Sequence, residues 1–296
     1  YKRQAPGGGE VRGMPRWMVK ALAVIPALAV STVVTSMVGA TLPPVAGFAL
    51  FVGGLVTGVL LLAGVGEPAA ARVLLASRPA RAEELDMLAG ALTVLCRAQL
   101  GPPVIRLRVR RGEHAIAAGG FGRRTVVVSG GLLDAVEGGH LPQDQAAAVI
   151  AHAGALVRGG WVRNDPAIGF WSLPWQVIVA VAQVVASVGR RLPLTSVAWR
   201  LRGIVLAIAV VQAVQLHQVW LAATIAGIGV VSYVMPVLEW RWRQLLLASG
   251  DVAVREAGLA SALADFLRRC PRTPDRQARL RTLEGSTHVM RPLGLV

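Results

Sequence analysis

The feature that most constrains the fold of this chain is a pair of apolar segments separated by only five residues. Ala21–Gly39 and Val45–Val65 contain no charged residue, and each is close to the length of about 20 residues that a helix needs to cross a bilayer. The linker Ala40–Pro44 is too short for anything but a tight turn. The sequence therefore predicts a transmembrane helical hairpin over residues 21–65, and the second span argues against a cleaved signal peptide.

Composition agrees that part of the chain lies in lipid. Hydrophobic residues make up 54% of the 296 residues and charged residues only 16%, whereas a soluble domain has about 25% charged residues. The more polar remainder is long enough for one soluble domain with its own core. The two cysteines, Cys96 and Cys270, lie far apart and outside any CxxC pattern, so we expect reduced thiols facing the cytosol.

The charge balance predicts which side of the membrane the polar segments occupy. The chain carries 31 Lys and Arg residues against 16 Asp and Glu residues, a net charge of +15. The flexible basic tail, residues 1–20, precedes the first span, and the linker to the second span has no charge. We therefore expect a cytosolic N-terminus at the inner (plasma) membrane and an arginine-rich face that meets anionic lipid. Nucleic-acid binding is disfavoured, because the arginines are dispersed and aromatic stacking partners are few.

Residues 66–166 show the periodicities of a small α+β domain. Apolar residues at helical spacing predict an amphipathic helix over Ala82–Leu100. Alternation then predicts a strand over Val104–Arg110, with its three arginines on a solvated face. Short strands are expected at Ala115–Ala118 and Thr125–Ser129, joined by a turn of glycines at positions 119, 120 and 122. The predicted helices that follow are Gly130–Val136 and Gln143–Arg158.

The second half of the chain returns to apolar sequence in residues 167–238. Ala167–Val188 is one apolar stretch, and Val219–Leu238 is the better span in the longer stretch that follows. Four arginines lie between them, at positions 190, 191, 200 and 202. A crossing by Ala167–Val188 would place these arginines outside, against the positive-inside bias. The alternative is that this stretch is an interfacial or re-entrant segment that does not cross. The sequence leaves both possibilities open. A long amphipathic helix over Gln244–Arg269 and a last short one over Asp275–Glu284 are expected to complete the cytosolic domain within residues 239–296.

Several motifs occur in an order that resembles one family. They are HAIAAGGFGRRTVVVSGGLL at His114–Leu133, VIAH at Val149–His152, GDVAVREAGLA from Gly250, and a Pro271…Arg276…Leu280 spacing preceded by Cys270. Together they resemble the HtpX-type membrane zinc metallopeptidases, relatives of the CAAX prenyl endopeptidases, over about Met18–Leu283. The resemblance implies a metallopeptidase-like cytosolic domain, with Gln143–Arg158 as its zinc helix.

The resemblance also implies a site whose chemical residues are missing here. The family's zinc helix carries His-Glu-x-x-His, in which two histidines bind zinc and the Glu is the general base. A later Glu, four residues before an Asp, is the third ligand. In this chain His152 matches the first ligand, Ala153 stands at the base, Leu156 at the second His and Leu247 at the third ligand, four residues before Asp251. None of the other histidines, at positions 114, 140, 217 and 288, shares a helical turn with His152.

These positions predict a degenerate site with no catalytic residue, no bound metal and no cofactor. We expect His152 and Asp251 to form a buried structural pair. The fold class is a mostly α integral membrane protein with a small α+β metallopeptidase-like domain, a short β-sheet packed on helices. The predicted function is an inactive pseudoprotease that acts as scaffold, adaptor or regulatory subunit of a membrane protein complex. The alternatives are an active zinc-dependent endopeptidase with a non-standard site, and a membrane-tethered binder of anionic lipid or nucleic acid.

Overall fold

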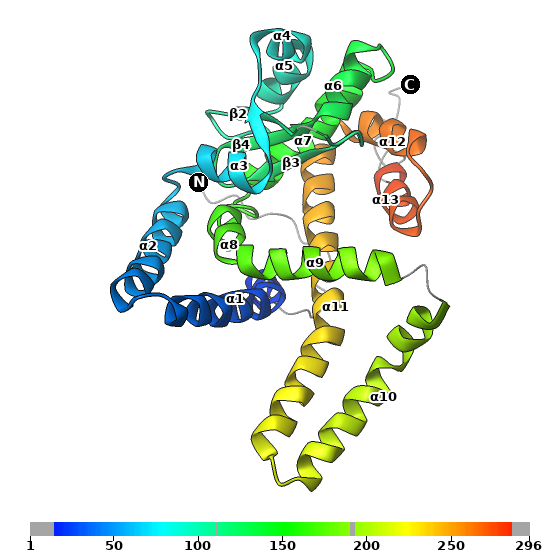
Figure 1. The fold of residues 1–296 in the computed structure, drawn as a ribbon. Coiled ribbons are helices and arrows are strands. Elements are labelled where there is room, and N and C mark those ends of the chain that lie inside the picture. Colours follow the sequence, from blue (N-terminus) through cyan, green and yellow to red (C-terminus); the bar gives the residue numbers. More distant parts are fainter. Residues whose placement is uncertain (1–14, 111, 190–192, 286–296) are drawn as a thin grey trace, which may run out of the picture. The chain divides into compact units, whose positions relative to one another are not determined.

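The structure, a computed structural model, describes residues 15–110, 112–189 and 193–285 (Figure 1). The chain forms two compact units. The mixed unit comprises Ser36–Trp171 and Leu246–Val296, and the helical unit comprises Tyr1–Thr35 and Ser172–Leu245. The protein is mostly helical with one small sheet, as the sequence predicted for its fold class.

Within the described residues, three helices are long and apolar enough to cross a membrane. They are α1 (Arg16–Thr41), α2 (Pro44–Ala63) and α11 (Val219–Glu256), with mean hydropathies of 2.1, 2.4 and 2.0. The helix α8 (Asp165–Trp171) and the start of α9 (Leu173–Gly189) have the required apolar length only when taken together as one broken span. These helices suggest a membrane protein, and α1 and α2 are the N-terminal pair of apolar helices that the sequence predicted.

The turn between α1 and α2 depends on a glycine. A Cβ atom added to Gly47 would lie 2.4 Å from the carbonyl oxygen of Gly39, which is closer than any side chain tolerates. Pro43 precedes the first helical residue of α2, and Pro44 takes the first-turn position where its missing N–H costs nothing. The two helices can therefore approach each other directly after the turn.

The described strands form one four-stranded sheet in the order β1-β2-β4-β3. Its central strands, β2 (Arg106–Arg110) and β4 (Thr125–Ser129), are parallel, whereas β1 (Ser77–Pro79) and β3 (Ala118–Phe121) pair antiparallel at the edges. The predicted strand Ala115–Ala118 is misplaced by about one strand length, because the glycines expected in the turn belong to β3. A Cβ added to Gly120 would lie 2.9 Å from the carbonyl oxygen of Ala153, so this strand needs glycine to pack against the helix that follows.

The sequence prediction for Arg108 was wrong. It was expected on a solvated strand face together with Arg106 and Arg110, but only those two are exposed, and Arg108 is 8% exposed. Its guanidinium donates hydrogen bonds to the hydroxyl and the carbonyl oxygen of Ser77. The strand β1, which the sequence did not reveal, covers this side of β2 and supplies these acceptors.

The helix α7 (Gln143–Arg158) is the centre of the core of the mixed unit. It contacts the strands β3 and β4, the helix α5 (Ala89–Arg97) and the helix α12 (Ala260–Arg269), and most of its residues are buried. The predicted helix Ala82–Leu100 is in fact two helices, α4 (Ala82–Met87) and α5, and Leu88 and Leu95 from that segment are fully buried. The short helix α6 (Gly130–Glu137) precedes α7, as predicted.

The prediction of one helix over Gln244–Arg269 was wrong. The helix α11 runs from the apolar segment through to Glu256 without a break, and Gly258, with a φ of +76°, then separates it from α12. The last helix, α13 (Pro274–Glu284), packs on α12. Residues 246–256 of α11 thus belong to the mixed unit, while the apolar part belongs to the helical unit.

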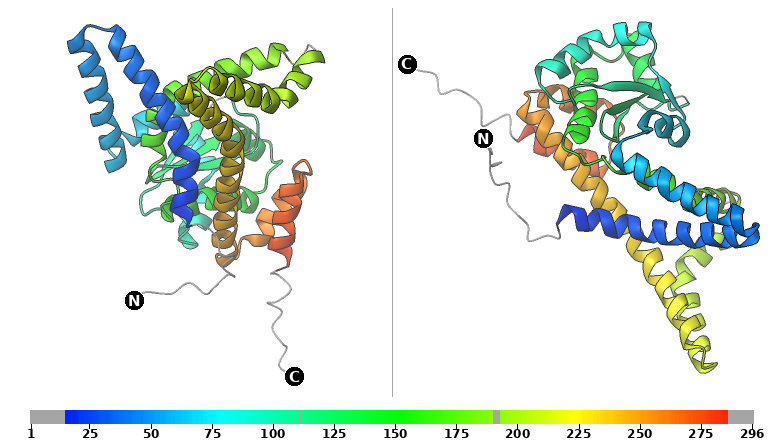
Figure 2. Two further views of the ribbon diagram at one scale, coloured as in Figure 1. Left: turned by 90° about the horizontal axis from the view of Figure 1, so that it is seen from below. Right: turned by 90° about the vertical axis from the view of Figure 1, so that its left-hand side faces the viewer.

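A hairpin of two long helices dominates the helical unit. The helix α10 (Pro193–Gln215) is joined to α11 by a three-residue turn in which His217 has a φ of +58°. Figures 1 and 2 both show the two helices side by side and antiparallel. In the same unit the Trp175 N–H donates to the Ser31 hydroxyl of α1, and the Lys20 ammonium lies 5.2 Å from the Trp242 ring centre.

A buried carboxylate attaches the end of α2 to the sheet. Glu67, the first residue of α3 (Glu67–Leu74), is 4% exposed, and its two oxygens accept hydrogen bonds from the backbone N–H groups of Arg123 and Arg124 in the β3–β4 turn. Gly122 has a φ of +71°, and a Cβ there would lie 2.4 Å from the Glu67 carboxyl carbon. The Arg123 side chain also donates to the carbonyl oxygen of Leu62.

We predict that Glu67→Ala destabilises the mixed unit, because two backbone donors at the turn lose their acceptor. The expected cost is roughly 1–3 kcal/mol for each buried donor left unsatisfied. Glu67→Gln, which keeps one acceptor oxygen, should cost less. Thermal unfolding of the purified protein in detergent measures the effect, with exposed Glu83→Ala as the matched control. Equal melting temperatures for the Glu67→Ala and Glu83→Ala variants would contradict the assigned role of Glu67.

Candidate functional site

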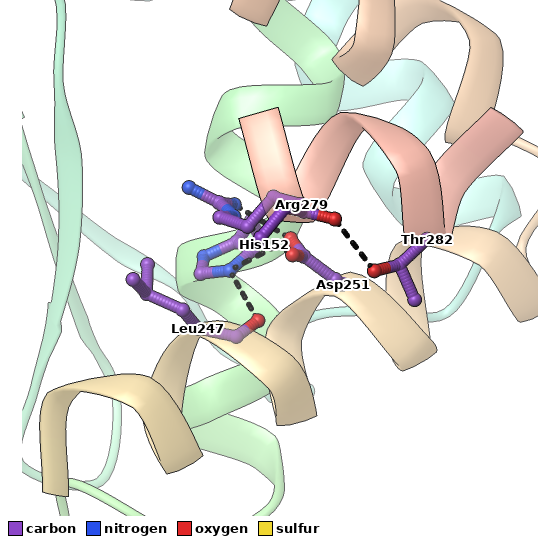
Figure 3. A network of polar contacts seen from close by, with 6 residues as sticks. His152, Leu247, Asp251, Arg279 and Thr282 are labelled. Carbon is purple, nitrogen blue, oxygen red and sulfur yellow. Dashed lines mark hydrogen bonds and ion pairs between the residues drawn. The ribbon is translucent and has the colours of Figure 1, made fainter. Parts of the chain in front are cut away.

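The residues that the sequence singled out come from two helices of the mixed unit. His152 lies in the middle of α7, and Leu247 and Asp251 lie one turn apart on the same face of α11. Asp144 in the first turn of α7 and Arg158 in its last turn suit the helix dipole. The structure brings His152 next to Leu247 and Asp251, although His152 and Leu247 are 95 positions apart in the sequence (Figure 3).

The imidazole of His152 faces two oxygen atoms. Its Nε2 atom is 3.3 Å from the carbonyl oxygen of Leu247 and 3.4 Å from Oδ1 of Asp251. Both are acceptors, so Nε2 carries a hydrogen and donates it. Gly250 makes room for the ring, because a Cβ there would lie 2.3 Å from Nε2. The side chains of His152 and Asp251 are 12% and 10% exposed, so the pair is largely withdrawn from water.

A third helix contributes a residue that the sequence analysis missed. Arg279 of α13 donates from Nε to Oδ2 of Asp251 at 2.8 Å and from Nη2 to Oδ1 at 2.6 Å (Figure 3). The sequence motif pointed to Arg276, one turn earlier, but the side chain of Arg276 donates to the carbonyl oxygen of Pro271. A signal was present: Arg279 is next to Leu280 and four residues before Leu283, both of which pack on the core.

The environment of Asp251 sets its protonation. Asp251 lies well beyond Leu238, where the apolar part of α11 ends. Burial by itself would raise the pKa of the Asp251 carboxyl, but the hydrogen bonds from Arg279 and His152, together with their charges, outweigh burial and hold this pKa below its ordinary value. The carboxylate is therefore ionised at neutral pH, and the bidentate guanidinium is its main partner.

The site residues do not fit the zinc ion that the resemblance implies. Catalytic zinc takes about three N, O or S ligands from the protein. Here the one imidazole donates its Nε2 hydrogen, and the one carboxylate already binds Arg279 through both oxygens. Among the residues that the structure describes, no group of three or more His, Cys, Asp or Glu side chains could hold a metal ion.

The remaining predicted positions lie in the core or away from the site. Ala153 is fully buried and Leu156 is 8% exposed, and both belong to the main core cluster. His114, His140 and His217 are exposed, and His288 lies outside the described residues. Cys270, which stands where the family motif has His, is a partly buried free thiol at the end of α12.

Comparisons of the chain with models of protein families, with curated proteins and with solved structures find no match. The site is therefore understood from its geometry. That geometry is a carboxylate shared by an arginine and a histidine, which joins three helices.

We predict that Arg279→Ala costs on the order of 3 kcal/mol of stability at neutral pH, because it leaves Asp251 buried without its main partner. Unfolding in detergent measures the loss, with Arg281→Ala as a control, since the Arg281 side chain on the same helix is exposed. A loss no larger than that of the control would contradict the role of Arg279.

The same variant should change the pH dependence of stability. In the native protein the lowered pKa of Asp251 gives a contribution that is complete above the unfolded value, about 3.9, and is lost as the pH falls through the folded pKa. Without Arg279, burial dominates and raises that pKa. Acid unfolding of Arg279→Ala should therefore begin at a higher pH than that of Arg281→Ala, and coinciding acid transitions would contradict this.

Proposed function

We propose that the chain is an inactive relative of the HtpX-type membrane zinc metallopeptidases whose fold acts as a scaffold, adaptor or regulatory subunit in a membrane complex. The observation that carries the proposal is the contact between α7 and α11. A resemblance drawn from separate motifs implies that His152, Leu247 and Asp251 lie together, and in the structure Nε2 of His152 is 3.3–3.4 Å from oxygen atoms of the other two.

The side chains at this contact support inactivity. The position of the general base is a fully buried alanine, Ala153, and the position of the second ligand is a buried leucine, Leu156. A group of polar ligands without a metal would be buried and unpaired, which is costly, and apolar replacements remove this cost. The guanidinium of Arg279 supplies positive charge next to Asp251 within the chain itself. Apolar side chains and the Arg279 guanidinium thus take the places of the zinc ligands and the metal charge, so the fold needs no zinc ion to pair its buried groups.

The buried serine at the end of β4 is not set up as a nucleophile for hydrolysis. Ser129, at the end of β4, is 1% exposed, and its hydroxyl oxygen accepts hydrogen bonds from the backbone N–H groups of Ala117 and Leu132. It is the N-cap of α6 and has a structural role. Ser129 therefore gives no support to the alternative of an active peptidase.

The proposal predicts the metal content of the protein. Purified full-length protein should contain far less than one zinc ion per chain by elemental analysis, and a chelator should leave its melting temperature unchanged. The double variant Leu156→His, Leu247→Glu restores two ligands on the faces of α7 and α11 that carry His152 and Asp251. This variant should bind about one zinc ion per chain.

The matched control is Leu156→His, Leu246→Glu, in which the carboxylate is one residue out of register on α11. It should bind no zinc beyond the native level. Stoichiometric zinc in the native protein, or hydrolysis of a membrane-protein substrate that is abolished by His152→Ala, would contradict the proposed inactivity. Equal zinc binding by the two double variants would contradict the ancestry of the site.

The scaffold role is tested separately in native membranes. Native gel migration after mild solubilisation should place the chain in an assembly larger than one chain, and this assembly should persist in a His152→Gln variant that folds normally. A chain that migrates alone, or an assembly lost only through His152→Gln, would contradict a role carried by the fold.

A further inference from the structure

The contact between α7 and α11 also restricts how the chain crosses the membrane. His152 and Asp251 are 3.4 Å apart, so both lie on the same side of the bilayer. The chain between Arg158 and Leu246 must therefore cross the membrane an even number of times. Three long helices lie in this interval, namely α9, α10 and α11. This inference uses the contact alone and does not depend on the proposed function.

The apolar part of α11 accounts for one crossing. Val219–Leu238 has the length of a membrane span, and the charged and aromatic residues Glu239–Arg243 follow it at the membrane boundary. The continuous helix then enters the mixed unit. An even total requires one more crossing, by either α9 or α10.

The packing of α10 against α11 identifies α10 as the second crossing. A Cβ added to Gly203 would lie 3.0 Å from the Tyr233 hydroxyl, and one added to Gly229 would lie 3.4 Å from the Leu206 side chain. These two contacts join α10 and α11 antiparallel along the span of α11 (Figure 2). The start of α10 therefore lies near the same membrane face as the Leu238 end of that span.

The lengths of the helices are compatible with this assignment. The 23 residues of α10 extend about 34 Å, against a hydrocarbon core of about 30 Å. Its apolar part is the shorter segment Gly203–Gln215, which carries no charged residue, and Arg200 and Arg202 precede it.

We propose that α9 does not cross the membrane and instead lies in the leaflet on the side of the mixed unit, where its apolar face binds acyl chains. Four apolar residues of α9 at helical spacing are 41–64% exposed, namely Val177, Ile178, Val181 and Val184. In this topology the four arginines that follow α9 in the sequence, at positions 190, 191, 200 and 202, stay on the side of the membrane that the mixed unit occupies, in agreement with the positive-inside rule. In this proposal, α8 and α9 together are apolar because α9 lies within one leaflet, and the pair does not cross the bilayer.

Cysteine accessibility in the full-length protein tests this topology. In a background with Cys96→Ser and Cys270→Ala, single cysteines are introduced as Leu42→Cys, Glu137→Cys, Pro193→Cys and Gln218→Cys. Sealed right-side-out and inverted membrane vesicles are treated with a membrane-impermeant maleimide. Leu42→Cys and Gln218→Cys should be labelled from one side, and Glu137→Cys and Pro193→Cys only from the other side.

Labelling of Pro193→Cys from the side of Gln218→Cys would overturn the proposal, because α9 would then cross. Labelling of Gln218→Cys from the side of Glu137→Cys would also overturn it, because α10 would then not cross. A protease recognition sequence inserted after Arg191 provides a second readout if Pro193→Cys is unreactive. Cleavage from the side of Glu137 supports the proposal, and cleavage from the opposite side overturns it.

Discussion

One buried carboxylate connects three helices that are distant in the sequence. Asp251 of α11 accepts two hydrogen bonds from Arg279 of α13 and lies against His152 of α7. An ionised carboxylate withdrawn from water is costly unless it is paired, so these contacts favour the packing of the three helices against one another. Gly250 is required for this arrangement, because any side chain there would collide with the imidazole.

A second buried carboxylate, Glu67, has a similar set of contacts within the mixed unit. Glu67 follows α2 closely and binds the backbone of the β3–β4 turn, just as Asp251 follows the apolar part of α11 and binds α7 and α13. Glu67 and Asp251 thus both follow an apolar segment in the sequence, and both find their donors within the mixed unit.

The chemistry available at the site follows from these pairings. His152 donates its Nε2 hydrogen, Asp251 has both oxygens engaged by Arg279, and the neighbouring positions 153 and 156 are apolar and buried. Such a set of groups stabilises a structure but offers no free base and no open ligand position.

The sequence by itself determined the elements that depend on local pattern. The apolar runs of α1 and α2, the strand β4 and the helix α7 follow from run length, alternation and helical periodicity, which are properties of neighbouring residues. The pairing of His152 with Asp251 was also expected, from the spacing of family-like motifs. The tertiary structure alone decided that β1 covers Arg108, that α11 continues to Glu256, and that Arg279 instead of Arg276 reaches the site. These features depend on which segments pack together, and no periodicity within a single segment encodes that.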